Sequence, residues 1–139
     1  MSEHCIIIGA SHAAAQLVSS LRQEGWEGKI SLIGDEPNLP YHRPPLSKAF
    51  FVGEKSADFY EKNKVDLLLG SRVTKIDRDA KQITLEDGAE ISYTKLALTT
   101  GARVRKIPFT GSELAGVFYM RDLNDVKQTH KFTAPGKSA

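Results

Sequence analysis

Short apolar runs that end in glycine alternate with a helical pattern at the start of the chain. Residues 5–8 form one such run, which ends at Gly9, and residues 30–33 form a second, which ends at Gly34. Between them, apolar residues recur at the spacing of one helical face from Ala14 to Leu21. A strand, a tight glycine turn, a helix and a strand make a βαβ unit, whose two strands run parallel.

Prolines interrupt this pattern in the next part of the chain. Because proline removes a backbone donor and fixes φ, the prolines at positions 37, 40, 44 and 45 predict irregular structure over residues 35–45. Pro45 suits the first turn of a helix, so a short helix is expected over residues 46–52. A further one or two helical turns are expected over residues 58–64.

Alternating apolar and polar residues then predict a small antiparallel β-meander. Its strands are expected at residues 72–77, 82–85 and 90–92, and Asp87 with Gly88 is a strong hairpin signal between the last two. Further elements are expected as strands at residues 65–69, 96–101 and 117–119, and as a helix at residues 124–132. The predicted fold class is therefore α/β, with a Rossmann-like βαβ unit, a parallel sheet and an inserted antiparallel β-meander.

Composition is that of an ordinary globular chain and excludes several classes of function. The 139 residues are 40% hydrophobic and 26% charged, and one domain is the prior at this length. The 19 basic and 17 acidic residues leave a net charge of +2, which argues against a nucleic-acid surface. No apolar run approaches the roughly 18 residues of a membrane span, and none resembles a signal-peptide core. A cytoplasmic protein with no membrane partner is therefore expected.

A candidate dinucleotide-binding turn connects the first predicted strand to the first predicted helix. Gly9, Ser11 and Ala14 occupy the three positions at which such a turn needs small residues. The first allows a sharp turn, the second lets a pyrophosphate approach backbone N–H groups, and the third lets the helix pack closely on the strand. Because two of the three usual glycines are replaced, the turn alone is a weak signal.

Asp35 strengthens the interpretation of this turn as part of a nucleotide-binding site. It follows the second predicted strand, close to the spacing expected of an acid that binds a ribose. Its carboxylate can accept hydrogen bonds from both ribose hydroxyls. The alternative is that Asp35 or Glu36 only caps the loop that follows. The four histidines show no metal-ligand spacing, so no metal site is expected.

Several strings of residues resemble one family of flavoproteins. These strings are residues 6–14, 32–37 and 39–48, with further matches at residues 70–77, 85–88, 100–103 and 116–121. They resemble the FAD domain of the NAD(P)H-dependent ferredoxin and rubredoxin reductases. The string Arg-Pro-Pro-Leu-Ser-Lys at residues 43–48 is highly specific to that family. The resemblance covers nearly the whole chain, apart from residues 55–58 and the tail.

The resemblance implies a set of contacts with FAD. Those at the pyrophosphate would be Gly9, Ser11 and Ala14, and those of the adenosine half would be Asp35, at the ribose, and the backbone of Val73, at the adenine. Thr100 and Gly101 would form the strand end that passes along the cofactor. The basic contacts would be Arg43, Lys48 and Arg121. Lys48 is the candidate catalytic residue, because a fixed cation beside the flavin stabilises its reduction. The alternative is that these cations are solvated surface charges.

The function implied by the resemblance is electron transfer. NAD(P)H would give hydride to FAD, and the flavin would pass single electrons to a ferredoxin- or rubredoxin-type acceptor. Because Cys5 is the only cysteine, no relay through a cysteine pair is expected. One alternative is a stand-alone nucleotide-binding module without redox turnover. Another is a Rossmann protein that binds NAD directly, although the proline-rich loop and the meander favour FAD.

The resemblance also implies which parts of the family's architecture this chain includes. Residues 1–133 would be a partial FAD-binding domain, and residues 134–139 would be a linker or truncation tail. The family's NAD(P)H-binding and C-terminal domains would be absent, as would a later Gly-Asp segment that returns to complete the FAD site. The 139-residue chain alone is therefore expected to bind FAD weakly and to be incomplete as an enzyme.

Overall fold

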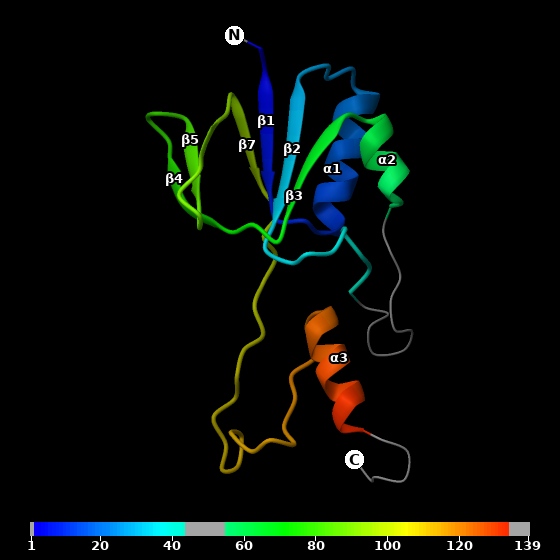
Figure 1. Ribbon diagram of the computed structural model, residues 1–139, viewed down its shortest axis with the longest axis vertical. Helices are drawn as coiled ribbons and strands as arrows, with labels where there is room; N and C mark the ends of the chain where they lie inside the picture. The colour runs from blue at the N-terminus through cyan, green and yellow to red at the C-terminus, as the bar shows by residue number, and fades with distance from the viewer. Residues whose placement is uncertain (1, 44–54, 134–139) are drawn as a thin grey trace. The chain divides into compact units, whose positions relative to one another are not determined.

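The computed structural model describes residues 2–43 and 55–133 (Figure 1). The chain divides into two compact units. Unit 1 comprises Met1–Tyr41 and Gly53–Gly101, and unit 2 comprises His42–Val52 and Ala102–Ala139. The helix predicted over residues 46–52 and the tail predicted at residues 134–139 lie outside the described residues.

A four-stranded parallel sheet forms the centre of unit 1. Its strands lie in the order β3 (Val65–Leu69), β2 (Lys29–Gly34), β1 (His4–Ile8) and β7 (Lys95–Leu98). All three strand pairs are parallel, and Ile8 aligns with both Ile33 and Leu98. The predicted parallel βαβ unit is therefore confirmed. The carboxyl ends of β1, β2 and β7 lie at one edge of the sheet, which we call the carboxyl edge.

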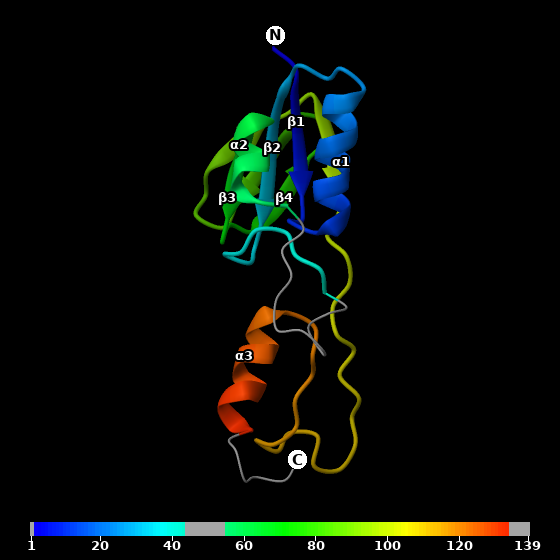
Figure 2. The same cartoon turned by 90° about the vertical axis from the view of Figure 1, so that its right-hand side faces the viewer.

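Two helices of unit 1, α1 (His12–Gln23) and α2 (Ala57–Lys62), lie on the same side of this sheet (Figures 1 and 2). They bury one core cluster against it, formed by Cys5, Ile7, Ala14, Val18, Ile30, Leu32, Tyr60 and Val65. Small residues on the inner face of α1 allow this close packing, because Ala14 and Ala15 are both fully buried. The first helix ends just before Gly25, whose φ of +83° no helix accommodates.

The antiparallel meander packs on the other face of the sheet. It consists of β4 (Val73–Asp77), β5 (Gln82–Leu85) and β6 (Glu90–Ser92), paired in that order. Ile83 and Leu85 of β5 form a second core cluster with three isoleucines of the parallel sheet: Ile6, Ile8 and Ile33. The predicted meander and its position between β3 and β7 are confirmed.

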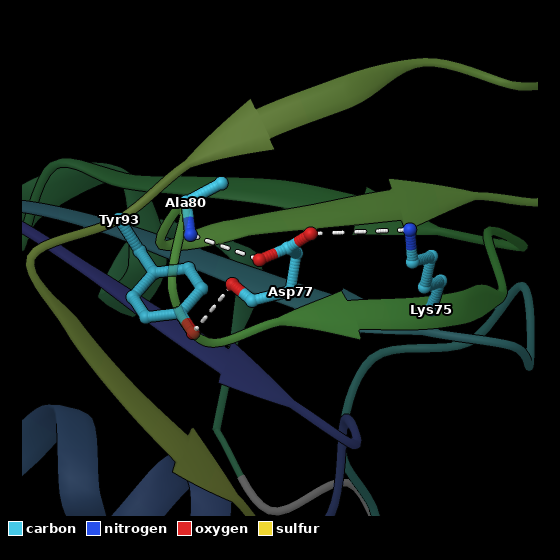
Figure 3. Close-up of polar contacts among 4 residues, drawn as sticks. All are labelled: Lys75, Asp77, Ala80 and Tyr93. Carbon is cyan, nitrogen blue, oxygen red and sulfur yellow. Dashed lines mark hydrogen bonds and ion pairs between the residues drawn. The ribbon is translucent and has the colours of Figure 1, made fainter.

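Asp77 closes the turn between β4 and β5 (Figure 3). Its Oδ1 accepts a hydrogen bond from the N–H of Ala80 at 2.8 Å, and its backbone carbonyl accepts one from the hydroxyl of Tyr93 at 3.4 Å. The Nζ of Lys75 lies 3.9 Å from the Asp77 carboxylate, but both side chains are well exposed. Such an ion pair contributes little to stability, so the Ala80 contact is the important one at this turn.

Two sequence predictions at strands are corrected by the structure. Residues 117–119 form no strand: the hydroxyl of Tyr119 accepts a hydrogen bond from the N–H of Ile107 at 3.1 Å, and Phe118 packs edge-on against Phe132. Side-chain contacts, rather than a backbone ladder, hold this segment. The strand predicted over residues 96–101 ends at Leu98, which is 61% exposed because β7 lies at the edge of the sheet among the described residues.

Unit 2 contains the helix α3 (Leu123–Phe132), as the sequence predicts. A capping box starts it: Asp122 accepts a hydrogen bond from the N–H of Asp125, and Asp125 accepts one from the N–H of Asp122. Leu123 and Val126 are its buried side chains. Within the described parts of the chain, no helix is long and apolar enough to cross a membrane.

Candidate functional site

The turn that follows β1 is tightly constrained at Gly9. This residue has a φ of +106°, and its N–H donates a hydrogen bond to the Ile33 carbonyl at 2.7 Å. A Cβ at this position would lie 2.4 Å from the carbonyl oxygen of Thr99 and 2.8 Å from the Cα of Thr100. Glycine is therefore required twice, by the left-handed backbone conformation and by the close approach of the chain after β7.

Ser11 fixes both the helix and the turn. Its Oγ accepts a hydrogen bond from the N–H of Ala14 at 3.4 Å and donates one to the Thr99 carbonyl at 2.9 Å. The first contact caps α1, and the second ties the cap to the end of β7. The hydroxyl of Ser11 therefore positions the turn, while the backbone N–H groups of the first helical turn remain the candidate phosphate donors.

Thr99 is a residue of this turn that sequence reasoning missed. Its hydroxyl donates a hydrogen bond to the Gly9 carbonyl at 2.8 Å, with the Ile8 carbonyl 3.2 Å away. Its own carbonyl accepts the bond from Ser11. The only signal in the sequence is a threonine directly after a strand, which is too common to single out.

Gly34, at the end of β2, was also missed as a site residue. A Cβ at Gly34 would lie 2.5 Å from the Cβ of Ala10. The end of β2 therefore passes directly against the turn after β1. The sequence marks Gly34 as the end of a strand, but it does not show which residue approaches it.

Asp35 lies at the carboxyl edge with an accessible carboxylate. It directly follows Gly34, its side chain is exposed, and no hydrogen bond or ion pair involves it among the described residues. Glu36 instead holds the loop, because its Oε2 accepts a hydrogen bond from the hydroxyl of Tyr41 at 2.5 Å. Either acid could have served only to cap the loop. Glu36 makes the contact within the loop, and the carboxylate of Asp35 stays accessible to a ligand.

Val73 begins β4 close to the same edge. Two backbone hydrogen bonds hold the chain that precedes Val73 against the end of β2. The N–H of Gly70 donates to the Glu36 carbonyl at 3.0 Å, and the N–H of Ser71 donates to the Gly34 carbonyl at 2.8 Å. The side chain of Val73 packs on the second core cluster. Val73 also pairs with Leu85 of β5, and the contact of its backbone with the adenine stays a prediction.

The remaining predicted site residues of unit 1 are Thr100 and Gly101. They follow Thr99 at the carboxyl edge and are both exposed, and Gly101 has a φ of +67°. Unit 1 therefore brings together Gly9, Ser11, Ala14, Asp35, Thr100 and Gly101 at the ends of three adjacent parallel strands. This edge is where open α/β sheets bind ligands.

The basic residues predicted for the site belong to unit 2. Arg43 donates a hydrogen bond from Nη1 to the carbonyl of Arg121 at 3.1 Å, and Arg121 donates from Nε to the carbonyl of Ala102 at 3.2 Å. The structure therefore brings Arg43 and Arg121 together within unit 2. Lys48 lies outside the described residues.

Titratable groups in the core have no part in this arrangement. Burial raises the pKa of the Cys5 thiol, which stays protonated inside the first core cluster. His4, at the amino end of β1, lies 2.9 Å from the Oγ of Ser31 through its Nε2. Within residues 2–43 and 55–133, no group of three or more His, Cys, Asp or Glu side chains could hold a metal ion.

Comparison with known proteins gives consistent matches over nearly all of the chain. A family model described as pyridine nucleotide-disulphide oxidoreductase matches residues 3–138. The chain is 42% identical over 134 residues to the ferredoxin–NAD(+) reductase subunit of the benzene 1,2-dioxygenase system of Pseudomonas putida. That match covers 91% of this chain and 33% of the relative. Rubredoxin-NAD(+) reductase of Pseudomonas putida is 39% identical over 134 residues, which cover 91% of this chain and 35% of that protein.

The fold also matches solved structures. A chain in the crystal structure of the covalent putidaredoxin reductase–putidaredoxin complex superposes with a TM-score of 0.84 at 33% identity, over 94% of this chain and 34% of that one. The chain thus spans about a third of the length of the curated relatives that it matches. The extent of the family match, together with the glycine turn and the parallel sheet, leads to one conclusion: this chain belongs to the pyridine nucleotide-disulphide oxidoreductase family.

Proposed function

We propose that this chain is the FAD-binding portion of an electron-transfer oxidoreductase, which passes electrons from NAD(P)H through FAD to a ferredoxin- or rubredoxin-type acceptor. The observation that carries the proposal is the carboxyl edge of unit 1, where the Gly9 turn lies beside the free carboxylate of Asp35. The names of the similar proteins support the rest, because they are reductases that act with NAD(+) and with ferredoxin or rubredoxin.

The residues at this edge fit the two polar parts of a dinucleotide. The turn around Gly9, Ser11 and Ala14 leads into the N-terminus of α1, where Ser11 caps the N–H of Ala14. The N–H groups and the dipole at a helix N-terminus attract a pyrophosphate. The carboxylate of Asp35 can accept hydrogen bonds from ribose hydroxyls, and the backbone of Val73 can contact the adenine. When bound, FAD supplies the capacity to accept hydride and to release electrons singly.

The remaining contacts in the proposal are Thr100 and Gly101, at the end of β7, and the cations Arg43, Lys48 and Arg121. A cation beside the flavin favours its reduction by stabilising the negative charge that develops on the ring, and we assign this role to Lys48. The support for the basic residues is the resemblance of residues 43–48 and 116–121 to the reductase family.

The proposal also covers the extent and the location of the protein. Residues 1–133 are assigned to a partial FAD-binding domain, and residues 134–139 to a linker. A cytoplasmic location is proposed because the nicotinamide donor of such an enzyme is a cytoplasmic coenzyme.

A flavin titration of the purified chain tests the proposed function. We expect FAD to bind saturably, to give a flavin spectrum and to be released on denaturation. ADP should compete, because it carries the adenosine and pyrophosphate groups that the carboxyl edge is proposed to hold. Binding of NAD(+) or ADP without binding of FAD would instead support a nucleotide-binding module without redox turnover.

A further inference from the structure

The loop that follows β2, residues 35–41, is anchored at its far end in the core of unit 1. Leu39 packs against the first core cluster, Pro40 is fully buried, and Tyr41 is 4% exposed. Proline also fixes the backbone φ at the position that it occupies. The loop that begins with Asp35 therefore ends on residues that are held by packing.

The near end of the same loop is held by the connection between β3 and β4. The N–H of Ser71 donates a hydrogen bond to the Gly34 carbonyl, and the N–H of Gly70 donates one to the Glu36 carbonyl. The residues on both sides of Asp35 are thus hydrogen-bonded through their backbones. The backbone is held here, and the direction of the side chains depends on further contacts.

One side-chain hydrogen bond connects the two ends of the loop. The hydroxyl of Tyr41 donates to the Oε2 of Glu36 at 2.5 Å. Because Tyr41 is buried and Glu36 is half-buried, this bond is partly shielded from water, which strengthens it. Glu36 is the neighbour of Asp35 in the chain, and the peptide unit between them is rigid. A displacement of Glu36 therefore changes the direction of the Asp35 side chain.

We propose that Tyr41 and Glu36 are positioning residues, whose hydrogen bond orients the carboxylate of Asp35 towards the hydroxyls of the adenosine ribose. The inference rests on the proposed function, which assigns Asp35 to that ribose. A carboxylate that receives two hydroxyls at once must be held in both position and orientation. A loop that is already fixed also loses less conformational entropy when a nucleotide binds.

The same hydrogen bond separates the roles of two adjacent acids. Glu36 is the other carboxylate close to the end of β2, but its Oε2 accepts the hydroxyl of Tyr41. That contact keeps the Glu36 side chain within the loop and leaves the ribose to Asp35. Neither Tyr41 nor Glu36 needs to touch the nucleotide in order to affect how tightly it binds.

The test compares the binding of ADP and of 2′,3′-dideoxy-ADP to the 139-residue chain by calorimetry. Only ADP has the ribose hydroxyls, so the ratio of the two affinities reports the ribose contact. ADP should bind the unchanged chain at least about tenfold more tightly, and in Asp35→Ala the ratio should fall to within about twofold of one. Tyr41→Phe should lower the ratio by at least about threefold. A merely structural role of Tyr41 would weaken both nucleotides equally and leave the ratio unchanged.

Three further variants control this measurement. Glu36→Gln keeps an oxygen that can accept the hydroxyl of Tyr41 and should retain most of the ratio, whereas Glu36→Ala should lower it as Tyr41→Phe does. Tyr93→Phe is the matched control, because it removes a tyrosine hydroxyl that donates to the Asp77 carbonyl in the meander. It should leave the ratio unchanged. A fall in Tyr93→Phe equal to that in Tyr41→Phe would overturn the inference.

A measurement without ligand distinguishes failure of this inference from failure of the proposed function. The ¹⁵N order parameters of the Asp35 and Glu36 amides should be about 0.85, the value of a rigid backbone, and should be clearly lower in Tyr41→Phe. Equal order parameters in the two proteins, or an unchanged nucleotide ratio in Tyr41→Phe, would overturn the inference. If the unchanged chain binds neither ADP nor FAD, the proposed function fails, whereas lower order parameters in Tyr41→Phe would still support the positioning of Asp35.

Discussion

Thr99 lies directly against Gly9, to which it is hydrogen-bonded, and it leaves no room there for a side chain. The hydroxyl of Thr99 donates a hydrogen bond to the Gly9 carbonyl at 2.8 Å, while a Cβ on Gly9 would lie 2.4 Å from the Thr99 carbonyl oxygen. The turn after β1 and the end of β7 therefore form one rigid edge before any ligand arrives. A preformed site of this kind loses less conformational entropy on binding.

The first prediction concerns the folding cost of a side chain at Gly9. Gly9→Ala should destabilise the protein by clearly more than the roughly 1–2 kcal/mol that a left-handed backbone costs a residue with a Cβ. The added cost arises because the Cβ meets backbone atoms of Thr99 and Thr100, which have no easy way to move aside. Urea unfolding without FAD measures this free energy.

Gly25→Ala is the matched control for that measurement. Gly25 has a similar left-handed φ of +83°, but a Cβ there would meet nothing within 4 Å. The control should therefore show only the conformational cost. Equal destabilisation by the two substitutions would show that the contact with Thr99 has no energetic importance.

The second prediction isolates the hydroxyl of Thr99. Thr99→Val keeps the shape of the side chain but removes the hydrogen bond to the Gly9 carbonyl, and it should cost about 1 kcal/mol of unfolding free energy. Thr99→Ser keeps the donor and should retain most of that contribution. If the valine and serine variants unfold at the same urea concentration, the hydroxyl does not hold the turn.

The turn shows how much of the site was predictable from sequence. The glycine that ends β1, the small residues after it and the acid after β2 follow a local pattern, so Gly9, Ser11, Ala14 and Asp35 could be chosen without a structure. Thr99 could not, because it meets Gly9 across 90 positions of the chain. The same holds for the contact of Gly34 with Ala10, which arises only when β2 pairs with β1.

Tertiary contacts also decide where the predicted elements were right or wrong. The parallel strands and the meander are confirmed. They could be predicted because their apolar residues follow the faces that the strands bury. Residues 117–119 have an equally suitable composition, but Phe118 and Tyr119 are held by a ring and by a backbone N–H elsewhere in unit 2, so no strand forms. The sequence likewise could not show which of Asp35 and Glu36 holds the loop. That depends on the hydroxyl of Tyr41, which donates its hydrogen bond to Glu36.

The third prediction concerns Asp35 as a ligand-binding acid. Asp35→Asn should leave the unfolding free energy unchanged within about 0.5 kcal/mol, because this exposed side chain has no partner among the described residues. It should weaken FAD binding by at least about tenfold, since hydrogen bonds to a charged group are worth roughly 1.5–3 kcal/mol. Fluorescence titration with FAD measures the affinity. The control is Asp79→Asn, which removes an exposed acid of the meander. Equal FAD affinities in the two variants would contradict the role of Asp35.

The fourth prediction is a pH dependence set by His4. Burial, and then the nearby charge of Lys29, lower the pKa of His4 below its ordinary 6.5, while the backbone carbonyl of Ser92 and the charge of Asp66 act in the opposite direction. The unfolded chain therefore takes up a proton at this residue more readily than the folded chain does. The contribution of His4 to stability is complete above about pH 6.5 and is lost as the pH falls towards the lowered pKa.

Urea unfolding between pH 5 and 7.5 tests this dependence. The unfolding free energy should decrease as the pH falls below about 6.5, and His4→Gln should flatten that decrease. Lys29→Met should reduce the decrease in part, because it removes the like charge beside the imidazole. A slope that is unchanged in His4→Gln would assign the pH dependence to other groups.

A nuclear magnetic resonance titration of the ¹⁵N-labelled chain with FAD tests the central claim most directly. The proposal predicts that the largest changes in amide shift occur at the carboxyl edge, at Gly9, Ser11, Asp35, Val73 and Thr100. The amides at the amino ends of β1 and β2, such as those of His4 and Lys29, should stay unchanged. The largest changes at those amino ends, or no saturable change anywhere, would contradict the assignment of the carboxyl edge as the FAD site.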